Sequence, residues 1–421
     1  MNKVSLYNKE IYGEVTTPNI LIDQLFDMLD DDIFNKKGVK WLDPCAGQGV
    51  FFSRLFDGEK LSLPNHKNNT YWMTEINTQH VNLLTTHFKQ YKFVNIKHID
   101  FLDFKEDNFD IIVANPPFQT GGSIKVPTKK GEKSKDGKEM WSYFVKHAID
   151  LLKDNGILLF ITPVIWLKRD HKMHEYILQY KIENMICYNA GEANKLFKGK
   201  CQTPIVLFKL IKTPVINKIQ NVKMGEIMYK FHISESIPMK HYNTLSKLKK
   251  YVETVGCLKV IKTSMRPGRP QQLKVNKEKT DEFPYKNVKT CVLKRIVANN
   301  NTTISPILVT EYSNIPCVFN NMKKLILAHK MHGYCYFDEK GEYGISNRDN
   351  YVIVDYNEAE LKQIHEFLNL KCIIELFDAT RYRMRFLERY IFDFIPNISS
   401  LPNFPKQITD SQIKTYFDLF I

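Results

Sequence analysis

The sequence predicts an α/β protein: a Rossmann-like sheet with flanking helices in the first half, then a mixed α+β second half. Short apolar strands alternate with helical stretches over the first 210 residues, as in βαβ units with a mostly parallel sheet. Four of these strands end in acidic residues, glycines or prolines. Near residues 211–222 the alternation stops, and short strands with Pro- and Gly-containing loops follow.

The elements are predicted in chain order. The first helix begins at Thr17-Pro18, with Thr17 as its N-cap and Pro18 at its first helical position. Apolar periodicity and turn residues define the other elements. Strands are expected at 39–43, 71–75, 93–100, 109–115, 156–163, 182–189 and 203–210, with helices at 77–91, 141–156 and about 358–390. The domain boundary is placed at 215, which gives domains of residues 1–215 and 216–421.

Composition excludes several classes of protein. The 421 residues suffice for two domains, and 43% hydrophobic with 25% charged residues is typical of a globular protein. The apolar runs are too short for a membrane span, and the N-terminus lacks the apolar core of a signal peptide. Eight scattered cysteines without a CxxC pair predict reduced thiols and no zinc site. We therefore expect a cytoplasmic protein, bacterial or made in a virus-infected cell.

Positive charge is concentrated in the second half. Residues 1–210 carry 28 Lys and Arg against 25 Asp and Glu, whereas residues 211–421 carry 32 against 21. This asymmetry predicts catalysis in the first half and polyanion binding in the second. A basic surface kept only for solubility is the alternative.

Polar groups follow four predicted strands at the edge where an open α/β sheet binds its ligand. Glycines let the backbone approach a ligand, and a helix start offers free N–H groups. The carboxyl group of Glu75 could accept hydrogen bonds from both hydroxyl groups of a ribose. The carboxyl group of Asp100 could accept one from an adenine amine, with the ring of Phe101 covering the adenine face. The four strand ends are Asp43-Pro44-Cys45-Ala46-Gly47-Gln48-Gly49, Glu75, Asp100-Phe101 and Asn115-Pro116-Pro117-Phe118. Phe52 stands where a dinucleotide fingerprint has its third glycine, which disfavours a pyrophosphate cradle.

In this order, TTPNIL (16–21), DPCAGQG (43–49), TEIN (74–77), DFL (100–102) and NPPF (115–118) resemble the γ-class S-adenosylmethionine-dependent DNA adenine methyltransferases of restriction–modification systems. The resemblance covers about residues 12–210. It implies that S-adenosylmethionine is surrounded by Thr17, Pro18, Asp43, Gly47, Gly49, Glu75, Asp100 and Phe101. It implies further that the target base is held by Asn115, Pro116 and Phe118. Cys45-Ala46 replaces the commoner Ala-Cys, and Phe118 replaces the commoner Tyr.

The Asn-Pro-Pro-Phe segment suits the chemistry of an exocyclic amine, whose lone pair is delocalised into the ring. The amide oxygen of Asn115 and the carbonyl oxygen of Pro116 could each accept one N–H of that amine. Two prolines would hold both acceptors rigidly, and such preorganisation contributes several kcal/mol. Phe118 would stack on a base flipped out of the duplex. Phe197 either closes the other face of the base or is an ordinary core residue, and both interpretations stay open.

Duplex DNA is the expected partner, with a separately encoded restriction endonuclease as a second partner that the resemblance allows. The second half would be the target-recognition domain, with DNA contacts from Arg266, Arg269, Lys274, Arg381, Arg383 and Arg385. No metal is required.

Three alternatives belong to other classes. The same motifs occur in methyltransferases that act on RNA or on a protein glutamine amide. A fused nuclease would use Asp355 with Glu360-Leu361-Lys362, although this stretch is typical of an amphipathic helix with a charged outer face. A non-catalytic DNA-binding protein would be expected to lose Asn115 or the glycine-rich turn, and both are present.

Overall fold

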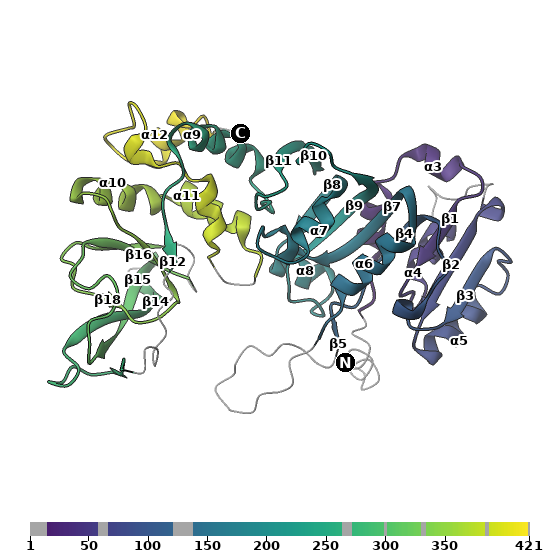
Figure 1. Cartoon of the computed structure of the whole chain (residues 1–421), viewed down its shortest axis with the longest axis horizontal. Helices are drawn as coiled ribbons and strands as arrows, with labels where there is room; N and C mark the ends of the chain where they lie inside the picture. The colour runs from purple at the N-terminus through teal and green to yellow at the C-terminus, as the bar shows by residue number, and fades with distance from the viewer. Residues whose placement is uncertain are drawn as a thin grey trace. The chain divides into compact units, whose positions relative to one another are not determined.

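The computed structural model describes residues 15–57, 66–120, 138–262, 272–298, 301–329, 334–383 and 387–419. The chain folds into two compact units, Met1–Ile237 and Pro238–Ile421 (Figure 1). The boundary lies after residue 237 and not at 215, because two further strands extend the sheet of the first unit. These are β10 (Ile219–Met224) and β11 (Ile227–His232), which pair as an antiparallel hairpin.

The first unit is built on a nine-stranded sheet with the order β11-β10-β8-β9-β7-β4-β1-β2-β3. Its other strands are β1 (Lys40–Asp43), β2 (Thr70–Glu75), β3 (Val94–His98), β4 (Phe109–Ala114), β7 (Leu152–Pro163), β8 (Tyr180–Tyr188) and β9 (Ile205–Pro214). Strands β3, β2, β1, β4 and β7 are mutually parallel, and β9 runs antiparallel to both β7 and β8. The predicted Rossmann-like, mostly parallel sheet is therefore confirmed. Two short strands, β5 (Gln119–Thr120) and β6 (Lys138–Glu139), form a separate pair.

The strand order reverses between β1 and β4. The chain builds β1, β2 and β3 outward on one side and then crosses back to add β4 on the other side of β1. At such a reversal the connections leave the carboxyl ends of the two central strands in opposite directions, which opens a crevice there. Polar residues at the ends of β1 and β4 therefore meet at one place.

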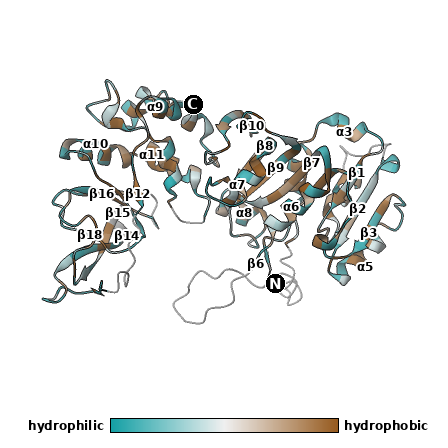
Figure 2. Ribbon diagram, in the orientation of Figure 1, coloured by the Kyte–Doolittle hydropathy of each residue, from teal (hydrophilic) through white to brown (hydrophobic). Residues whose placement is uncertain are grey.

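Helices cover both faces of this sheet, so its central strands are apolar on both sides (Figure 2). The helices are α2 (Asn19–Phe26), α3 (Asp31–Asn35), α4 (Val50–Asp57), α5 (Thr78–His87), α6 (Trp141–Leu151), α7 (His174–Leu178) and α8 (Ala190–Leu196). Ile111 and Val113 of β4 join one buried cluster with residues of α2, α4 and α8. On the other face Phe208 of β9 packs edge-to-face on Trp166, at a ring-centroid distance of 5.2 Å.

Two predicted helix boundaries were wrong. Helix α2 starts at Asn19 with Pro18 as its N-cap residue, and no side chain caps it; Thr17 uses its hydroxyl group elsewhere, as described below. Helix α6 ends at Leu151 and not at Gly156, because Leu152 already pairs with Phe109 of β4. Periodicity alone could not reveal that pairing.

The second unit contains two four-stranded sheets, β12-β19-β16-β17 and β13-β15-β14-β18. Their strands are β12 (Ile261–Lys262), β13 (Val275–Asn276), β14 (Tyr285–Ala298), β15 (Asn301–Ser313), β16 (Lys324–Ala328), β17 (Cys335–Asp338), β18 (Gly344–Ile345) and β19 (Asn350–Ile353). In β16, Leu325 and Leu327 face a cluster shared with the helices, while Ile326 faces a cluster that includes Val288 of β14. The first of these sheets is thus buried on both faces, which confirms the mixed α+β character of this half.

The helices of the second unit are α9 (Tyr242–Val255), α10 (Glu358–Leu368), α11 (Lys371–Leu376) and α12 (Asp410–Tyr416). The single helix predicted over 358–390 is instead broken at Leu370, whose backbone is extended. Short 3-10 turns at Phe377–Thr380 and Arg389–Phe394 follow α11. Helix α10 is amphipathic as expected, with Leu361, Ile364 and Phe367 buried. None of the described helices combines the length and apolar character needed to cross a bilayer.

The neighbouring residues Lys323 and Lys324 allow a buried ion pair of the second unit to be compared with an exposed one. The Lys324 side chain is wholly buried and bonds Asp338 Oδ2 at 2.5 Å, whereas Lys323 pairs with Glu358 at the exposed surface. Lys324→Met should lower the free energy of unfolding by about 3–5 kcal/mol, because it leaves the Asp338 carboxyl group buried without its cation. Lys323→Met should cost less than about 1 kcal/mol. Urea unfolding followed by circular dichroism measures both, and equal losses would contradict the role assigned to the buried pair.

Candidate active site

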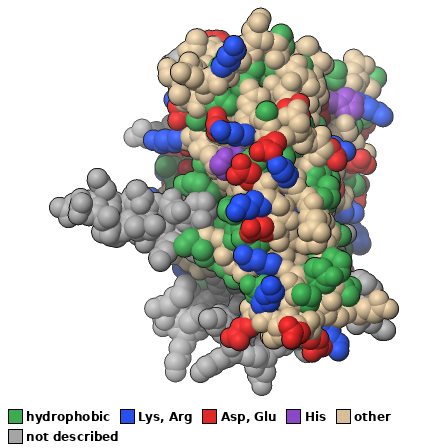
Figure 3. Space-filling view, turned by 90° about the vertical axis from the view of Figure 1, so that its left-hand side faces the viewer, with side chains coloured by type: hydrophobic (Ala, Val, Ile, Leu, Met, Phe, Trp, Pro, Cys, Tyr) green, Lys and Arg blue, Asp and Glu red, His purple; other side chains and the backbone are tan. Residues whose placement is uncertain are grey.

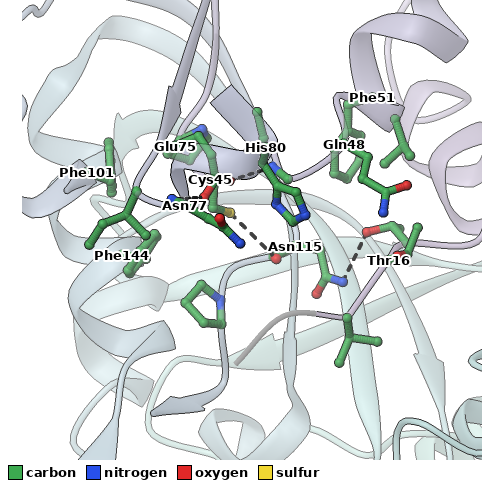
Figure 4. A pocket seen from close by; sticks show the side chains of 18 of the residues that line it. Thr16, Cys45, Gln48, Phe51, Glu75, Asn77, His80, Phe101, Asn115 and Phe144 are labelled. Atoms are coloured by element: carbon green, nitrogen blue, oxygen red, sulfur yellow. Dashed lines mark hydrogen bonds between the residues drawn. The ribbon is translucent and has the colours of Figure 1, made fainter. Parts of the chain in front are cut away.

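A pocket opens at the carboxyl ends of β1, β2 and β4, where the strand order reverses (Figure 4). Six predicted site residues line it together: Thr17, Gly47, Glu75, Asp100, Phe101 and Asn115. Its other lining residues are Val15, Thr16, Pro44, Cys45, Ala46, Gln48, Val50, Phe51, Ile76, Asn77, His80, Ile99, Pro117 and Phe144. Acidic, amide and aromatic side chains thus converge from strand ends that are far apart in the sequence.

Glu75 joins the turn after β1 to the start of α5. Its Oε2 accepts a hydrogen bond from Gly47 N at 2.7 Å, and its Oε1 accepts one from Asn77 N at 2.7 Å. The turn needs its glycines, since Gly47 and Gly49 have φ values of +53° and +77°. A Cβ on Gly49 would also lie 2.6 Å from Phe88 Cε2. The glycine-rich turn is therefore held in shape by a carboxyl group from the next strand.

Asp43 lies fully buried below this turn. Its Oδ1 accepts a hydrogen bond from Cys45 N at 3.2 Å, and its Oδ2 has no partner among the described residues. The pKa of Asp43 is raised to about 8, chiefly by burial and to a smaller extent by the nearby Glu75, while the hydrogen bond from the Cys45 N–H lowers it. Below that pH the side chain is a neutral carboxylic acid.

Asn115 follows β4 and is tied to the segment before α2. Its Nδ2 donates to Thr17 Oγ1 at 3.1 Å, while its main-chain oxygen accepts from Cys45 Sγ at 3.6 Å. Since Thr17 takes up the amide nitrogen, the amide oxygen is the atom left to accept from a ligand. Thr17 therefore anchors Asn115 instead of capping a helix. The amide lines the pocket, as the sequence predicts.

Aromatic and acidic residues form the opposite end of the pocket. Asp100 Oδ1 accepts from Leu102 N at 3.0 Å, which fixes the carboxyl group at the end of β3. The ring of Phe101 packs on Phe144 of α6, with centroids 5.1 Å apart. Phe101 is 2% exposed and Phe144 is 6% exposed, so this wall is apolar. A flat aromatic group beside a carboxyl group suits an adenine ring with its amine.

Sequence reasoning missed Asn77 and Phe144. Asn77 Oδ1 caps α5 by accepting from Gln79 N at 3.0 Å, and its Nδ2 is buried in the pocket with no partner in the described part of the chain. Its position directly after Thr74-Glu75-Ile76, before a helix, was an available signal. Nothing in the sequence indicates that Phe144 faces Phe101, because that contact depends on how α6 packs.

Six predicted cofactor- or base-binding residues do not line the pocket: Pro18, Asp43, Gly49, Pro116, Phe118 and Phe197. Asp43 accepts a hydrogen bond from the lining residue Cys45, Gly49 belongs to the turn after β1, and Phe118 is half-buried against the first-unit core. Phe197 is 4% exposed within that core, so the ring offers no open face to a base in this structure. Of the two interpretations that the sequence left open for Phe197, the structure therefore favours an ordinary core residue.

The expected DNA contacts are only partly described. Arg266, Arg269 and Arg385 lie outside the described residues. Lys274 is exposed, whereas Arg381 pairs with Asp378 at 2.6 Å and Arg383 pairs with Glu388 at 2.6 Å.

The carboxyl groups of the nuclease alternative serve other purposes. Glu360 accepts from Asn357 N in a capping box, and Asp355 pairs with Lys259 at the surface. No group of three potential metal ligands occurs among the residues that the structure describes.

The reversed strand order and the pocket at the strand ends define a Rossmann-like fold with a candidate ligand site at the usual place for such a sheet. Residues 3–196 match the Eco57I restriction-modification methylase family, over less than half of the 421 residues. No curated protein sequence matches the chain.

Solved structures that are similar to this chain include the following three. The type I restriction-modification system methyltransferase subunit from Streptococcus thermophilus is 20% identical, with a TM-score of 0.37 over 50% of this chain and 47% of that one. A protein from Listeria monocytogenes that is described as a class I S-adenosylmethionine-dependent methyltransferase is 16% identical. Its TM-score is 0.38, over 49% of this chain and 65% of that one. The type IIG restriction endonuclease BpuSI is 11% identical, with a TM-score of 0.44 over 95% and 61%. The matched part spans about half the length of the first of these proteins.

The buried acid predicts a specific pH dependence. The folded protein keeps a proton on Asp43 that the unfolded chain releases near pH 3.8, so this group makes stability fall as the pH rises from about 4 to about 8. The Asp43→Asn variant lacks this pH-dependent contribution to stability, because its amide does not titrate. The difference in unfolding temperature between wild type and Asp43→Asn should therefore change between about pH 4 and about pH 8 and stay constant outside that range. Thermal unfolding of both proteins over the pH range measures this, and a constant difference would refute the assigned protonation state.

Proposed function

We propose that this chain is a site-specific DNA methyltransferase that transfers a methyl group from S-adenosylmethionine to the N6 amine of an adenine in duplex DNA. The observation that carries the proposal is the amide of Asn115, held by Thr17 in the same pocket as Glu75 and the glycine turn. The family match over residues 3–196 supports a methylase of restriction–modification type.

The pocket residues fit S-adenosylmethionine. The buried Asn77 amide has an unpartnered Nδ2, and Glu75 and Asp100 bring carboxyl groups to the rim of an apolar wall. Glu75 would bind the ribose hydroxyls, Asp100 and Phe101 the adenine ring, and the backbone at Gly47 the remainder of the molecule. When bound, the cofactor supplies an electrophilic methyl group on its sulfonium.

Asn115 and Pro116 would activate the target amine. The amide oxygen of Asn115 and the carbonyl oxygen of Pro116 each accept one N–H of the amine, which localises the nitrogen lone pair. Because two prolines and the Thr17 bond restrict this segment, the acceptors need not reorganise during the reaction. The reaction also requires the amine nitrogen to lie in line with the methyl carbon and the sulfonium sulfur. Binding both reactants in one site supplies that arrangement.

The adenine must leave the helical stack to reach a pocket of this kind. Phe118, half-buried beside the pocket segment, would stack on the extruded base. The second unit would bind the duplex and select the site. We therefore assign target recognition to residues 238–421.

The proposal is tested by incubating the full chain with methyl-labelled S-adenosylmethionine and mixed DNA, followed by digestion to nucleosides. Label is expected in N6-methyl-2′-deoxyadenosine. Asn115→Ala should lower kcat by about 10²–10³-fold with little change in cofactor affinity, since it removes an acceptor of the reacting amine. Label confined to cytosine, to RNA or to protein would overturn the assignment.

Thr17 should act through Asn115 and not through cofactor affinity. Thr17→Val removes the hydroxyl partner of the amide, and a misplaced acceptor should lower kcat by roughly tenfold to a hundredfold. Thr17→Ser keeps the hydroxyl group and should restore most of the activity. Steady-state kinetics and cofactor titrations separate the two effects; a loss of cofactor affinity without a loss of kcat would contradict this positioning role.

A further inference from the structure

Four exposed cations gather in the second unit from three separate segments. Lys262 ends β12, Arg348 precedes β19, and Arg383 and Arg389 flank a buried carboxyl group, that of Glu388. The four are separated by as many as 127 positions, so the fold and not the local sequence brings them together. We call them the cation cluster.

Backbone and side-chain bonds fix these segments to one another. Lys262 lies opposite Tyr351 in the β12–β19 pair, and the Tyr351 hydroxyl group donates to Leu387 O at 2.9 Å. The main chain of His329 bridges the other two segments. Its N–H donates to Asp349 O at 2.7 Å, and its carbonyl oxygen accepts from Leu387 N at 2.8 Å.

Glu388 neutralises only part of this charge. Arg383 binds both of its oxygens, at 2.6 and 3.0 Å, in the geometry of a bidentate pair. Within the described residues no carboxyl group forms an ion pair with Lys262, Arg348 or Arg389. Glu388 and Asp349 are the two acids that act on His329, beside Lys262 and Arg383 of the cluster.

The cations also influence one another. Burial lowers the pKa of Lys262, and Arg383, Arg389 and Arg348 lower it further against the opposing effect of Glu388. On the face shown in Figure 3, Lys and Arg side chains lie among acidic and apolar ones. The repulsion among the four cations of the cluster would be relieved by a bound anion.

We propose that Lys262, Arg348 and Arg389, positioned around the Arg383–Glu388 pair, form a contact site for the phosphate backbone of duplex DNA. This inference rests on the proposed function and names the surface through which the second unit would hold its substrate. Exposed Lys and Arg side chains on separate segments suit phosphates spaced along a strand better than a single small anion. Such contacts position the duplex without reading its sequence.

The test is the salt dependence of DNA binding by the full chain. A triple variant, Lys262→Gln with Arg348→Gln and Arg389→Gln, is compared with wild type on a short fluorescein-labelled DNA duplex. Each lost phosphate contact should reduce the slope of log K against log salt by about 0.9. Between about 50 and 200 mM salt the wild type should therefore lose roughly 40-fold more affinity than the triple variant.

A charge-matched control removes three other exposed cations of the same unit, as Lys340→Gln, Lys362→Gln and Lys371→Gln. The control should keep the wild-type slope, and thermal unfolding verifies that both triple variants remain folded. Equal slopes for the two triple variants would overturn the inference while leaving the methyltransferase proposal intact. Wild type that binds no duplex DNA would contradict the proposed function itself, and tighter binding to an RNA duplex of equal length would contradict DNA as the partner.

Discussion

The reversal of strand order between β1 and β4 is the constraint on which the rest of the first unit depends. It leaves the carboxyl ends of both strands free of crossing connections, so that the turn after Asp43 of β1 and Asn115 after β4 meet at one crevice. The Glu75 bonds to Gly47 and Asn77 then set the turn between β1 and α4 against the start of α5. The pocket is thus a product of topology first and of side-chain chemistry second.

The sequence predicted what is local. Strand positions, the glycine turn and the acids at strand ends follow from periodicity and composition, and most of them were placed correctly. The bond between Asn115 and Thr17 joins residues 98 positions apart and could not be read from either motif. The burial of Asp43 and the contact of Phe101 with Phe144 likewise arise from packing between layers. The helix predicted over 358–390 is broken at Leu370, whose backbone is extended and whose side chain packs against the core of the second unit.

The second unit shows the same limit in its charges. Its excess of Lys and Arg is visible in the composition, yet among the described residues picked from the sequence only Arg383 belongs to the cation cluster that the fold assembles. Arg381 was chosen from a basic run, but an acid three positions away neutralises it. Arg348 and Lys262 stand in unremarkable sequence, yet hydrogen bonds through Tyr351 and His329 link their segments. Cations that the fold brings together therefore indicate a binding surface better than cations that are merely close together in the sequence.

An acid that keeps its proton changes the charge of the sheet edge to which it belongs. The pKa of Asp43 is about 8, so its side chain is a neutral acid near pH 7 that can donate one hydrogen bond as well as accept. Its Oδ2 has no partner among the described residues. The residue that closes β1 therefore contributes hydrogen-bonding capacity, and almost no negative charge, to this edge of the sheet.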